Sequence, residues 1–250
     1  MDAVNAYRQV QEHYGQVATT NLPEGYQQKV AIEDLHSIPD SSNLGVSCGN
    51  PLAIANVDKG ETLIDLGCGG GIDVLLAAAK VGPEGKANML DLARRNADKA
   101  GVSNASFVEA SITSIPLPTA TADRIISNCV INLVPAADKP LIFHEMFRLF
   151  KPGGRIAISD IPAKKELPSE VRNDFSLYVG CIAGASPVHG YENDLDLYKV
   201  MWEAERADKP GQSSPQVSCS SCCGAQVGRS QVRPEPRSFQ VYTIKPKVIA

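Results

Sequence analysis

Short apolar runs alternate along the chain with longer segments in which apolar residues recur every third or fourth position. A short run bounded by turn residues is typical of a buried strand, and the longer spacing indicates one apolar face of a helix. Strands are expected at 63–66, 105–110, 122–129 and 155–161, and helices at 74–81, 88–100 and 139–150. Because strands and helices alternate, the sequence predicts an α/β fold with a doubly wound, mainly parallel sheet.

The two ends of the chain carry other patterns. Residues 2–20 have apolar or aromatic residues at spacings of three and four, which predicts a helix that either forms a lid over a ligand crevice or docks on the domain. Two further helices are expected at 170–183 and 195–204. Residues 239–244 alternate apolar and polar and predict a closing strand.

These patterns divide the chain into five expected parts. Residues 205–238 are rich in Ser, Gln, Pro and Gly, so we expect no packed element there. The parts are an N-terminal helix and loop (1–47), an α/β domain (48–162), a small C-terminal lobe (163–204), the disordered segment (205–238) and a closing strand with its tail (239–250).

The second strand of the sheet is missing from the pattern. A doubly wound unit needs a strand after its first helix, commonly ending in an acidic residue that holds ribose hydroxyls. Between Gly85 and Asn88 there is no room for the usual five or six residues. Three explanations compete: a variant gene model or splice form, residues missing from the sequence, or a diverged nonproductive protein. We favour the first two, because losing a central strand orphans a row of backbone hydrogen bonds.

The stretch Leu63 to Asp73 is a strand, a glycine turn and a helix start. The glycines allow positive φ and let a ligand approach the backbone, and the helix offers unpaired N–H groups. Asp65, just ahead of the turn, suits a cationic ligand and would repel a pyrophosphate. The stretch therefore favours S-adenosylmethionine over a dinucleotide, with a purely structural turn as the open alternative.

Composition narrows the choice of partners. The 250 residues are 43% hydrophobic and carry a net charge of −4, with acids and bases mixed, which gives no reason to expect a nucleic-acid partner. No run of 18 apolar residues predicts a membrane span, and the N-terminus lacks a signal-peptide layout. We expect a cytoplasmic protein that binds neither nucleic acid nor membrane.

Seven cysteines indicate that the chain has thiol groups available for a second kind of site. An odd number in a cytosolic chain points to metal, catalytic or core roles and not to a disulfide scaffold. Their spacing does not match a zinc finger. Cys48 lies between turn residues, which predicts an accessible thiol.

Five segments in order resemble arsenite S-adenosylmethionine methyltransferases, a family of class I (Rossmann-like) methyltransferases. The glycine turn and the KPGG stretch are shared by class I methyltransferases in general, whereas the remaining segments are characteristic of the arsenic branch. The segments are GVSCGNP (45–51), LIDLGCGGGID (63–73), RIISNCVINLVP (124–135), LFKPGGRIAISDI (149–161) and YVGCIAGA (178–185).

The resemblance implies that cysteine thiolates bind trivalent arsenic and that methyl groups move to it from S-adenosylmethionine. Cys48 and Cys181 match the family's arsenic-binding cysteines. A third thiol is expected near the C-terminus, from Cys219, Cys222 or Cys223, unless these belong to a disordered tail that binds soft metals incidentally. Cys68 and Cys129 are interpreted as core or turn residues. No cysteine precedes Cys48, so the family's N-terminal thiol is missing.

The resemblance also implies the cofactor contacts and the roles of the parts. Residues 48–162 become the S-adenosylmethionine-binding domain and 163–204 the arsenic-binding lobe. Expected partners are arsenite or its thiol conjugates and a thiol reductant such as glutathione or thioredoxin. The mapped cofactor contacts are Asp65, Gly67, Gly69, Gly71, Asp73, Ile112, Asn128 and Cys129.

Two other functions stay open. A non-catalytic arsenic-binding protein would keep the thiols but lack a competent cofactor pocket, because the ribose-binding strand is gone. A methyltransferase for an ordinary small organic nucleophile would explain the glycine turn but not the segments around Cys48 and Cys181. It would usually need a positioned base, for which only His144 and His189 are candidates.

Overall fold

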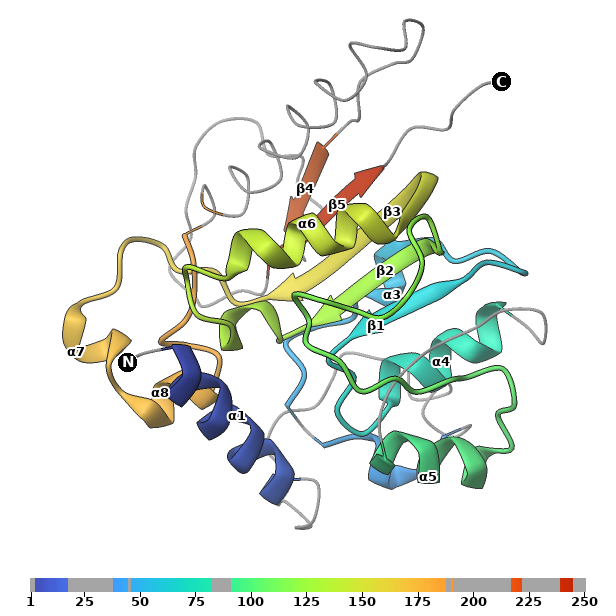
Figure 1. Cartoon of the computed structure of the whole chain (residues 1–250), viewed down its shortest axis with the longest axis horizontal. Coiled ribbons are helices and arrows are strands. Elements are labelled where there is room, and N and C mark those ends of the chain that lie inside the picture. The colour runs from blue at the N-terminus through green and yellow to red at the C-terminus, as the bar shows by residue number, and fades with distance from the viewer. Residues whose placement is uncertain are drawn as a thin grey trace, which may run out of the picture.

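A five-stranded sheet forms the centre of the chain (Figure 1). The computed structural model describes residues 3–17, 38–44, 46–81, 91–187, 190, 217–221 and 239–244. Neighbouring strands follow the order β1-β2-β3-β5-β4; β1, β2 and β3 run parallel, and β5 runs antiparallel to β3 and β4. This confirms the α/β fold. The strands are β1 (Leu63–Leu66), β2 (Ala122–Asn128), β3 (Phe150–Asp160), β4 (Val217–Ser221) and β5 (Phe239–Ile244).

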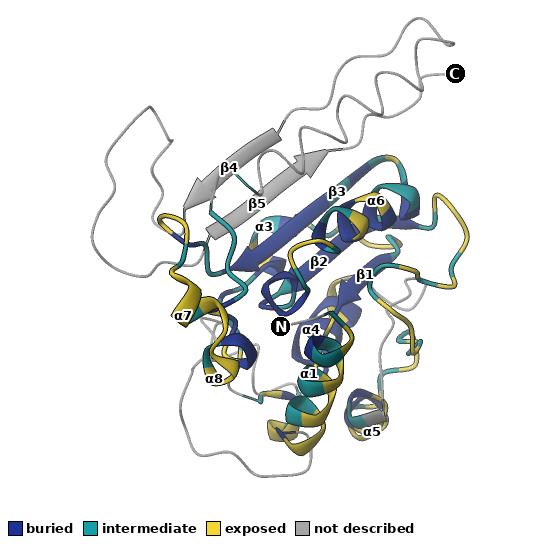
Figure 2. Cartoon of the chain, turned by 60° about the vertical axis from the view of Figure 1, so that its left-hand side comes forward, coloured by how far each residue is buried: buried dark blue, intermediate teal, exposed yellow. Residues whose placement is uncertain are grey.

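Helices cover both faces of the three parallel strands. Successive strand residues point to opposite faces, so a strand buried on both sides is apolar throughout. Ile125 and Ile156 pack with α6, whereas Ile126 and Ala157 pack with α3 and α4. Figure 2 shows these strands buried between the layers. The helices are α1 (Ala3–Val17), α3 (Leu52–Ala55), α4 (Ile72–Val81), α5 (Asp91–Ala100), α6 (Lys139–Leu149), α7 (Ser169–Arg172) and α8 (Phe175–Val179), with 3-10 turns η1 (Asp40–Ser42) and η2 (Ile131–Leu133).

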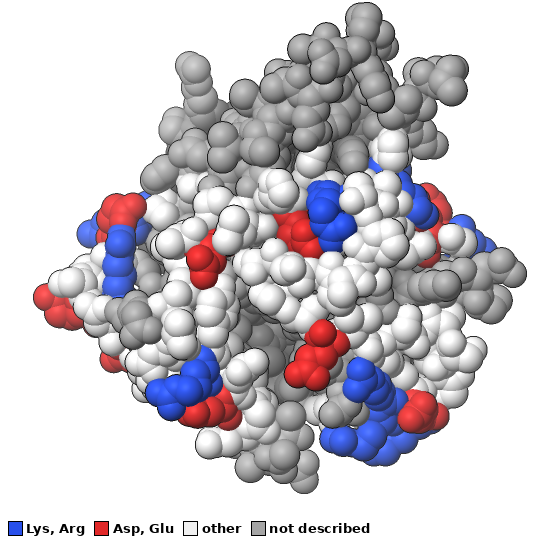
Figure 3. Space-filling view, in the orientation of Figure 1, with Lys and Arg blue, Asp and Glu red and all other residues white. Residues whose placement is uncertain are grey.

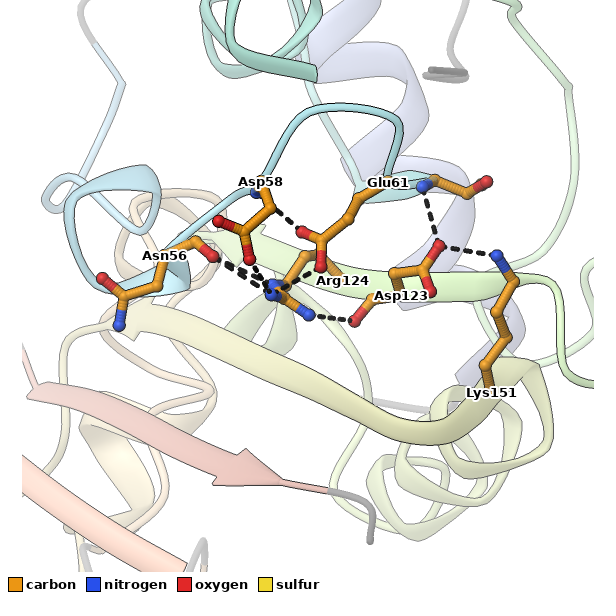
Figure 4. A network of polar contacts seen from close by, with 7 residues as sticks. Asn56, Asp58, Glu61, Asp123, Arg124 and Lys151 are labelled. Atoms are coloured by element: carbon orange, nitrogen blue, oxygen red, sulfur yellow. Dashed lines mark hydrogen bonds and ion pairs between the residues drawn. The ribbon is translucent and has the colours of Figure 1, made fainter. Parts of the chain in front are cut away.

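A polar network fastens the edge of the sheet where β1 and β2 begin (Figure 4). The guanidinium of Arg124, 3% exposed, lies 2.6 Å from a carboxylate oxygen of Glu61 and donates to the backbone oxygen of Asn56 at 3.1 Å. Lys151 donates to Asp123 at 2.6 Å. These contacts use side chains at the amino ends of the strands, so the opposite edge, where the strands end, is left for the glycine turn.

The N-terminal helix docks beside the C-terminal lobe. In Figures 1 and 2, α1 lies next to α8 at the carboxyl ends of the parallel strands. The hydroxyl of Tyr14 donates to the backbone oxygen of Val179 at 2.9 Å, and Ala6 and Val10 pack against Tyr178. The structure thus shows α1 docked on the lobe, one of the two arrangements that the apolar stripe leaves open, and the lid role stays a prediction. No helix among the described residues is both long and apolar enough to cross a membrane.

The strand expected at 105–110 is wrong. Apart from a bridge at Ala105, these residues carry no regular structure, and within the described residues β1 pairs in the sheet with β2 alone. In a doubly wound sheet, a strand at 105–110 would pair with the strand that the sequence lacks before Asn88. Without that neighbour its backbone has no ladder to join. Residues 82–90 lie outside the described part of the chain.

Other expectations need smaller corrections. The helix expected at 170–183 is two short helices, α7 and α8, and ends at Val179. The segment 205–238 contains β4, which pairs with β5, so it is not wholly without packed structure. The closing strand at 239–244 is confirmed as β5. The helix expected at 195–204 lies outside the described residues, and the five-part division of the chain stays a prediction.

Candidate active site

The glycine turn joins β1 to α4 at the carboxyl edge of the sheet. Gly67 and Gly71 have φ of 85° and 95°, a conformation that residues with a Cβ rarely adopt. A Cβ at Gly67 would collide with the side chain of Val130, and one at Gly70 would stand 2.5 Å from the backbone oxygen of Ser42. The helix starts at once, with Leu75 N–H donating to Gly71 O at 2.9 Å. Glycine is therefore required at these positions because neighbouring parts of the chain pack directly against the turn.

Asp65 is a buried carboxylate beneath this turn. It is 2% exposed, and neither of its oxygens has a hydrogen-bond partner within the described residues. Burial, with the nearby charge of Asp73, raises the pKa of Asp65 well above its usual value. Such a group is costly unless a cationic donor meets it. The orphaned carboxylate fits the amino group and sulfonium of S-adenosylmethionine and does not fit a pyrophosphate.

Asn128, the last residue of β2, joins three segments of the chain. Its side-chain amide donates to Ser47 Oγ at 2.6 Å, to Gly49 O at 3.1 Å and to a carboxylate oxygen of Asp73 at 2.8 Å. Its side-chain oxygen accepts the backbone N–H of Cys48 at 3.1 Å. The loop that carries Cys48 is therefore fastened to the end of β2 and to the first turn of α4.

Three cysteines from distant segments meet at this edge. Cys48 and Cys129 are paired as a disulfide, with Cα atoms 5.5 Å apart, within the usual range. The thiol of Cys181 donates to the backbone oxygen of Cys129 at 2.9 Å, and all three side chains belong to one apolar cluster with Leu133. A carboxylate oxygen of Asp160 lies within 4.8 Å of the sulfurs of Cys48 and Cys129. We call Cys48, Cys129 and Cys181 the sulfur cluster.

Cys181 is held by polar groups that the sequence did not single out. Asn132 donates to the backbone oxygen of Cys181 at 3.2 Å, and Lys139 donates to Gly184 O at 2.5 Å. Burial, followed by the charge of Asp160, raises the pKa of the Cys181 thiol to about 12. Cys181 is therefore a thiol, not a thiolate, at neutral pH.

Cys129 and Cys181 share an unusual backbone conformation. Their φ angles are 60° and 62°, in the left-handed region that favours glycine. Strained residues of this kind concentrate at functional sites, where the surrounding structure holds them.

The structure brings some of the expected site residues together. Cys48 and Cys181 share one cluster, as the resemblance implies. Cys129 is buried in an apolar cluster, as expected of a core residue, and is also the disulfide partner of Cys48, which the sequence analysis did not expect. Cys68 is half-buried in the glycine turn and outside the cluster. Ile112 packs on the main core.

The proposed third thiol is not placed by the structure. Cys222 and Cys223 lie outside the described residues, and Cys219 is described only as part of the backbone of β4. The sequence analysis expects Cys129 as a cofactor contact and core residue but not as a sulfur partner of Cys48, and it does not single out Asp160, although one signal was available. Each stands at the end of a predicted parallel strand, and such ends meet at one edge of a doubly wound sheet.

The charged side chains on the surface do not indicate the kind of ligand that the protein binds. On the face shown in Figure 3, the described basic and acidic side chains are interspersed. This face therefore shows no broad field of one sign that would select a highly charged ligand.

Known methyltransferases are similar to this chain over more than half of its length. The model of a methyltransferase domain family matches residues 57–212, more than half of the chain. The arsenite methyltransferase of Halobacterium salinarum is 39% identical over 171 residues, which cover 66% of this chain and 43% of the relative. The human arsenite methyltransferase is 29% identical and is matched over 53% of its length. The chain thus spans about half the length of these curated relatives.

A solved structure shares both fold and sequence features. The arsenic(III) S-adenosylmethionine methyltransferase of Chlamydomonas reinhardtii aligns with a TM-score of 0.58 and 26% identity, over 88% of this chain and 71% of that one. These matches confirm the resemblance read from the sequence, the fold class, and S-adenosylmethionine as the cofactor. A [4+2]-cyclase at 13% identity aligns with a TM-score of 0.57, so the fold alone does not specify a reaction.

Proposed function

The chain belongs to the methyltransferase domain family, and from this premise we propose that it moves a methyl group from S-adenosylmethionine to trivalent arsenic held by its sulfur cluster. The observation that carries the proposal is the convergence of Cys48, Cys129 and Cys181 beside the glycine turn. Trivalent arsenic is soft and prefers sulfur ligands. A buried carboxylate that suits a cation, Asp65, and a thiol cluster for a soft metalloid lie near the same edge of the sheet.

The protein's part in the reaction is capture and orientation. Each thiol displaces a hydroxyl of arsenite, and its proton leaves with that hydroxyl as water. Arsenic keeps a lone pair and is itself the nucleophile, so no general base is needed. S-adenosylmethionine supplies the electrophilic methyl group. Holding arsenic in line with that carbon would supply much of the rate enhancement.

Arsenic capture requires the cluster to be reduced. The Cys48–Cys129 disulfide has no free sulfur to offer, so two electrons from a thiol reductant such as glutathione or thioredoxin must open it first. A reducing compartment, the cytoplasm, provides such reductants. Within this proposal the reaction serves arsenic detoxification, with Cys222 and Cys223 as candidate additional ligands.

The direct test is methylation by the purified chain. With S-adenosylmethionine, arsenite and a thiol reductant, we expect methylated arsenic, detected by chromatography with elemental mass spectrometry. Cys48→Ser and Cys181→Ser should abolish turnover while calorimetry still shows cofactor binding. Cys68→Ser is the matched control, because it removes one thiol that lies outside the sulfur cluster. Its arsenite binding should be unchanged. Full turnover in both cluster variants would exclude capture by these thiols.

One observation favours a second candidate, an arsenic-binding protein without methyl transfer. Within the described residues β1 has one sheet neighbour and residues 105–110 form no strand, so the part of the fold expected to hold the ribose is altered. Tight arsenite binding without measurable binding of S-adenosylmethionine would select this candidate.

A further inference from the structure

Asp160 stands where a carboxylate is unexpected. It is the last residue of β3, is 2% exposed, and has a carboxylate oxygen within 4.8 Å of the sulfurs of both Cys48 and Cys129. Its charge also acts on the third cysteine, because it contributes to raising the pKa of Cys181. One acidic side chain thus lies beside two members of the sulfur cluster and influences the third electrostatically.

A carboxylate does not help thiols to capture a metalloid. A negative charge nearby disfavours the thiolate form, which is the better ligand. Arsenic bound by three sulfurs is neutral overall, so the bound substrate gives Asp160 no charge to balance. Arsenic capture therefore does not explain why Asp160 lies beside the sulfurs, and we look for the explanation in the methyl-transfer step.

The charge at arsenic changes during methyl transfer. The arsenic lone pair forms the new As–C bond while the bond between carbon and the sulfonium sulfur breaks and returns its electron pair to that sulfur. The sulfonium becomes a neutral thioether, and arsenic becomes a four-coordinate arsonium with one positive charge. Atoms, electrons and charge balance without any other reactant.

This positive charge moves toward Asp160. Asp65, which suits the cationic cofactor, lies on β1, and Asp160 lies on β3, two strands away in the sheet. Adjacent strands are about 4.8 Å apart, so the backbones that carry the two carboxylates are roughly 10 Å apart. An ionised carboxylate beside the atom that becomes positive would stabilise the transition state more than the neutral bound substrate.

Resting on the proposed function, we propose that Asp160 is an electrostatic stabiliser of the arsonium that forms on Cys48, Cys129 and Cys181. It acts on the methyl-transfer step and on neither arsenic capture nor cofactor binding. The sulfurs select the substrate, and Asp160 favours the charge that the reaction creates on it.

The test uses the full chain, reduced and preloaded with arsenite, and measures one turnover after S-adenosylmethionine is added. Asp160→Asn keeps the shape and removes the charge; we expect the single-turnover rate to fall about tenfold to a hundredfold. Arsenite stoichiometry and affinity, measured by equilibrium dialysis, and cofactor affinity, measured by calorimetry, should stay within about twofold of the wild type, a change of less than about 0.5 kcal/mol. Asp160→Glu, which restores the charge, should recover most of the rate, which a purely structural role would not predict.

Three results would overturn the inference. An undiminished rate in Asp160→Asn removes the charge effect while leaving the proposed function intact. A parallel loss of arsenite binding would make Asp160 a ligand or a structural group. No methylated arsenic from the wild-type chain would remove the proposed function and this inference together. If Asp160→Asn does not fold, Asp160→Ser, smaller and also uncharged, carries the same expectation.

Discussion

The backbone N–H of Cys48 donates a 3.1 Å hydrogen bond to the side-chain oxygen of Asn128, the residue directly before Cys129. This bond fixes the loop that carries Cys48 to the end of β2, so Cys48 is held next to Cys129. The side chain of Asn128 thus connects two segments of the chain that are 80 residues apart in sequence. Asn128 was expected as a cofactor contact, and the structure adds this second role.

Asn128→Ala should loosen the loop that carries Cys48. It removes the bonds to Ser47, Cys48 and Asp73, so we expect a loss of about 1–3 kcal/mol in the free energy of unfolding, measured with denaturant on the reduced chain. Re-oxidation should form less of the Cys48–Cys129 disulfide. Asn104→Ala is the control, since that amide donates to Ala78 O away from the cluster. Equal disulfide yield in both variants would contradict the role of Asn128.

The oxidation state of the chain should control arsenite binding. Peptide mapping of air-oxidised protein without reductant should recover Cys48 linked to Cys129, and this form should bind no arsenite. After reduction, we expect one arsenic per chain by elemental mass spectrometry. Cys129→Ser should abolish both the linked peptide and tight binding. Arsenite bound equally well by oxidised protein would show that the metalloid is held elsewhere.

Asp65 should destabilise the cofactor-free chain at neutral pH. Its pKa is raised in the folded state, so its contribution to stability is present below the unfolded value of 3.8 and is lost as pH rises through the folded pKa. At pH 7, Asp65→Asn should therefore raise the free energy of unfolding by about 1–3 kcal/mol, and the gain should shrink near pH 4. Affinity for S-adenosylmethionine should fall at least about tenfold. A less stable Asp65→Asn chain at pH 7 would mean that the carboxylate has a cationic partner.

Cys181 should make the reduced chain sensitive to alkali. The folded pKa of about 12 lies above the ordinary 9.0, so the stabilising effect of the protonated thiol is complete below pH 9 and declines as pH rises toward 12. Relative to Cys181→Ser, the wild type should lose up to about 1.4 kcal/mol for each pH unit above 9. Urea unfolding at pH 8 and pH 10 measures this difference. Parallel pH dependence in the two chains would indicate that the thiol is not buried.

Local patterns predicted the parts of the fold that depend on local sequence. The glycine turn, β1 and α4 follow from an apolar run, four glycines and a helical spacing, and β5 follows from an alternating pattern. The strand expected at 105–110 failed because a strand exists only with a partner. The strand β4, rich in Ser and Cys, was missed because its residues carry no apolar pattern.

The site was predictable in its chemistry but only partly in its geometry. Cysteines 48 and 181 were recognised by the segments around them. Cys129 follows β2 and precedes Val130 and Ile131, so it resembles an ordinary core position; only the meeting of strand ends places it against Cys48. Asn132 and Lys139 fasten the loop of Cys181 from positions that no spacing rule connects to it.

The left-handed backbone at Cys129 and Cys181 has a consequence for anyone who tries to improve this protein. Glycine would relax each position, at a saving of about 1 kcal/mol apiece, and a library sorted for heat resistance would collect those replacements first. The variants selected in this way would be more stable but would lack two thiols of the sulfur cluster. Cysteine at these two positions keeps the reactive thiols at a cost in stability. Both residues should therefore be left unchanged in any effort to stabilise the protein.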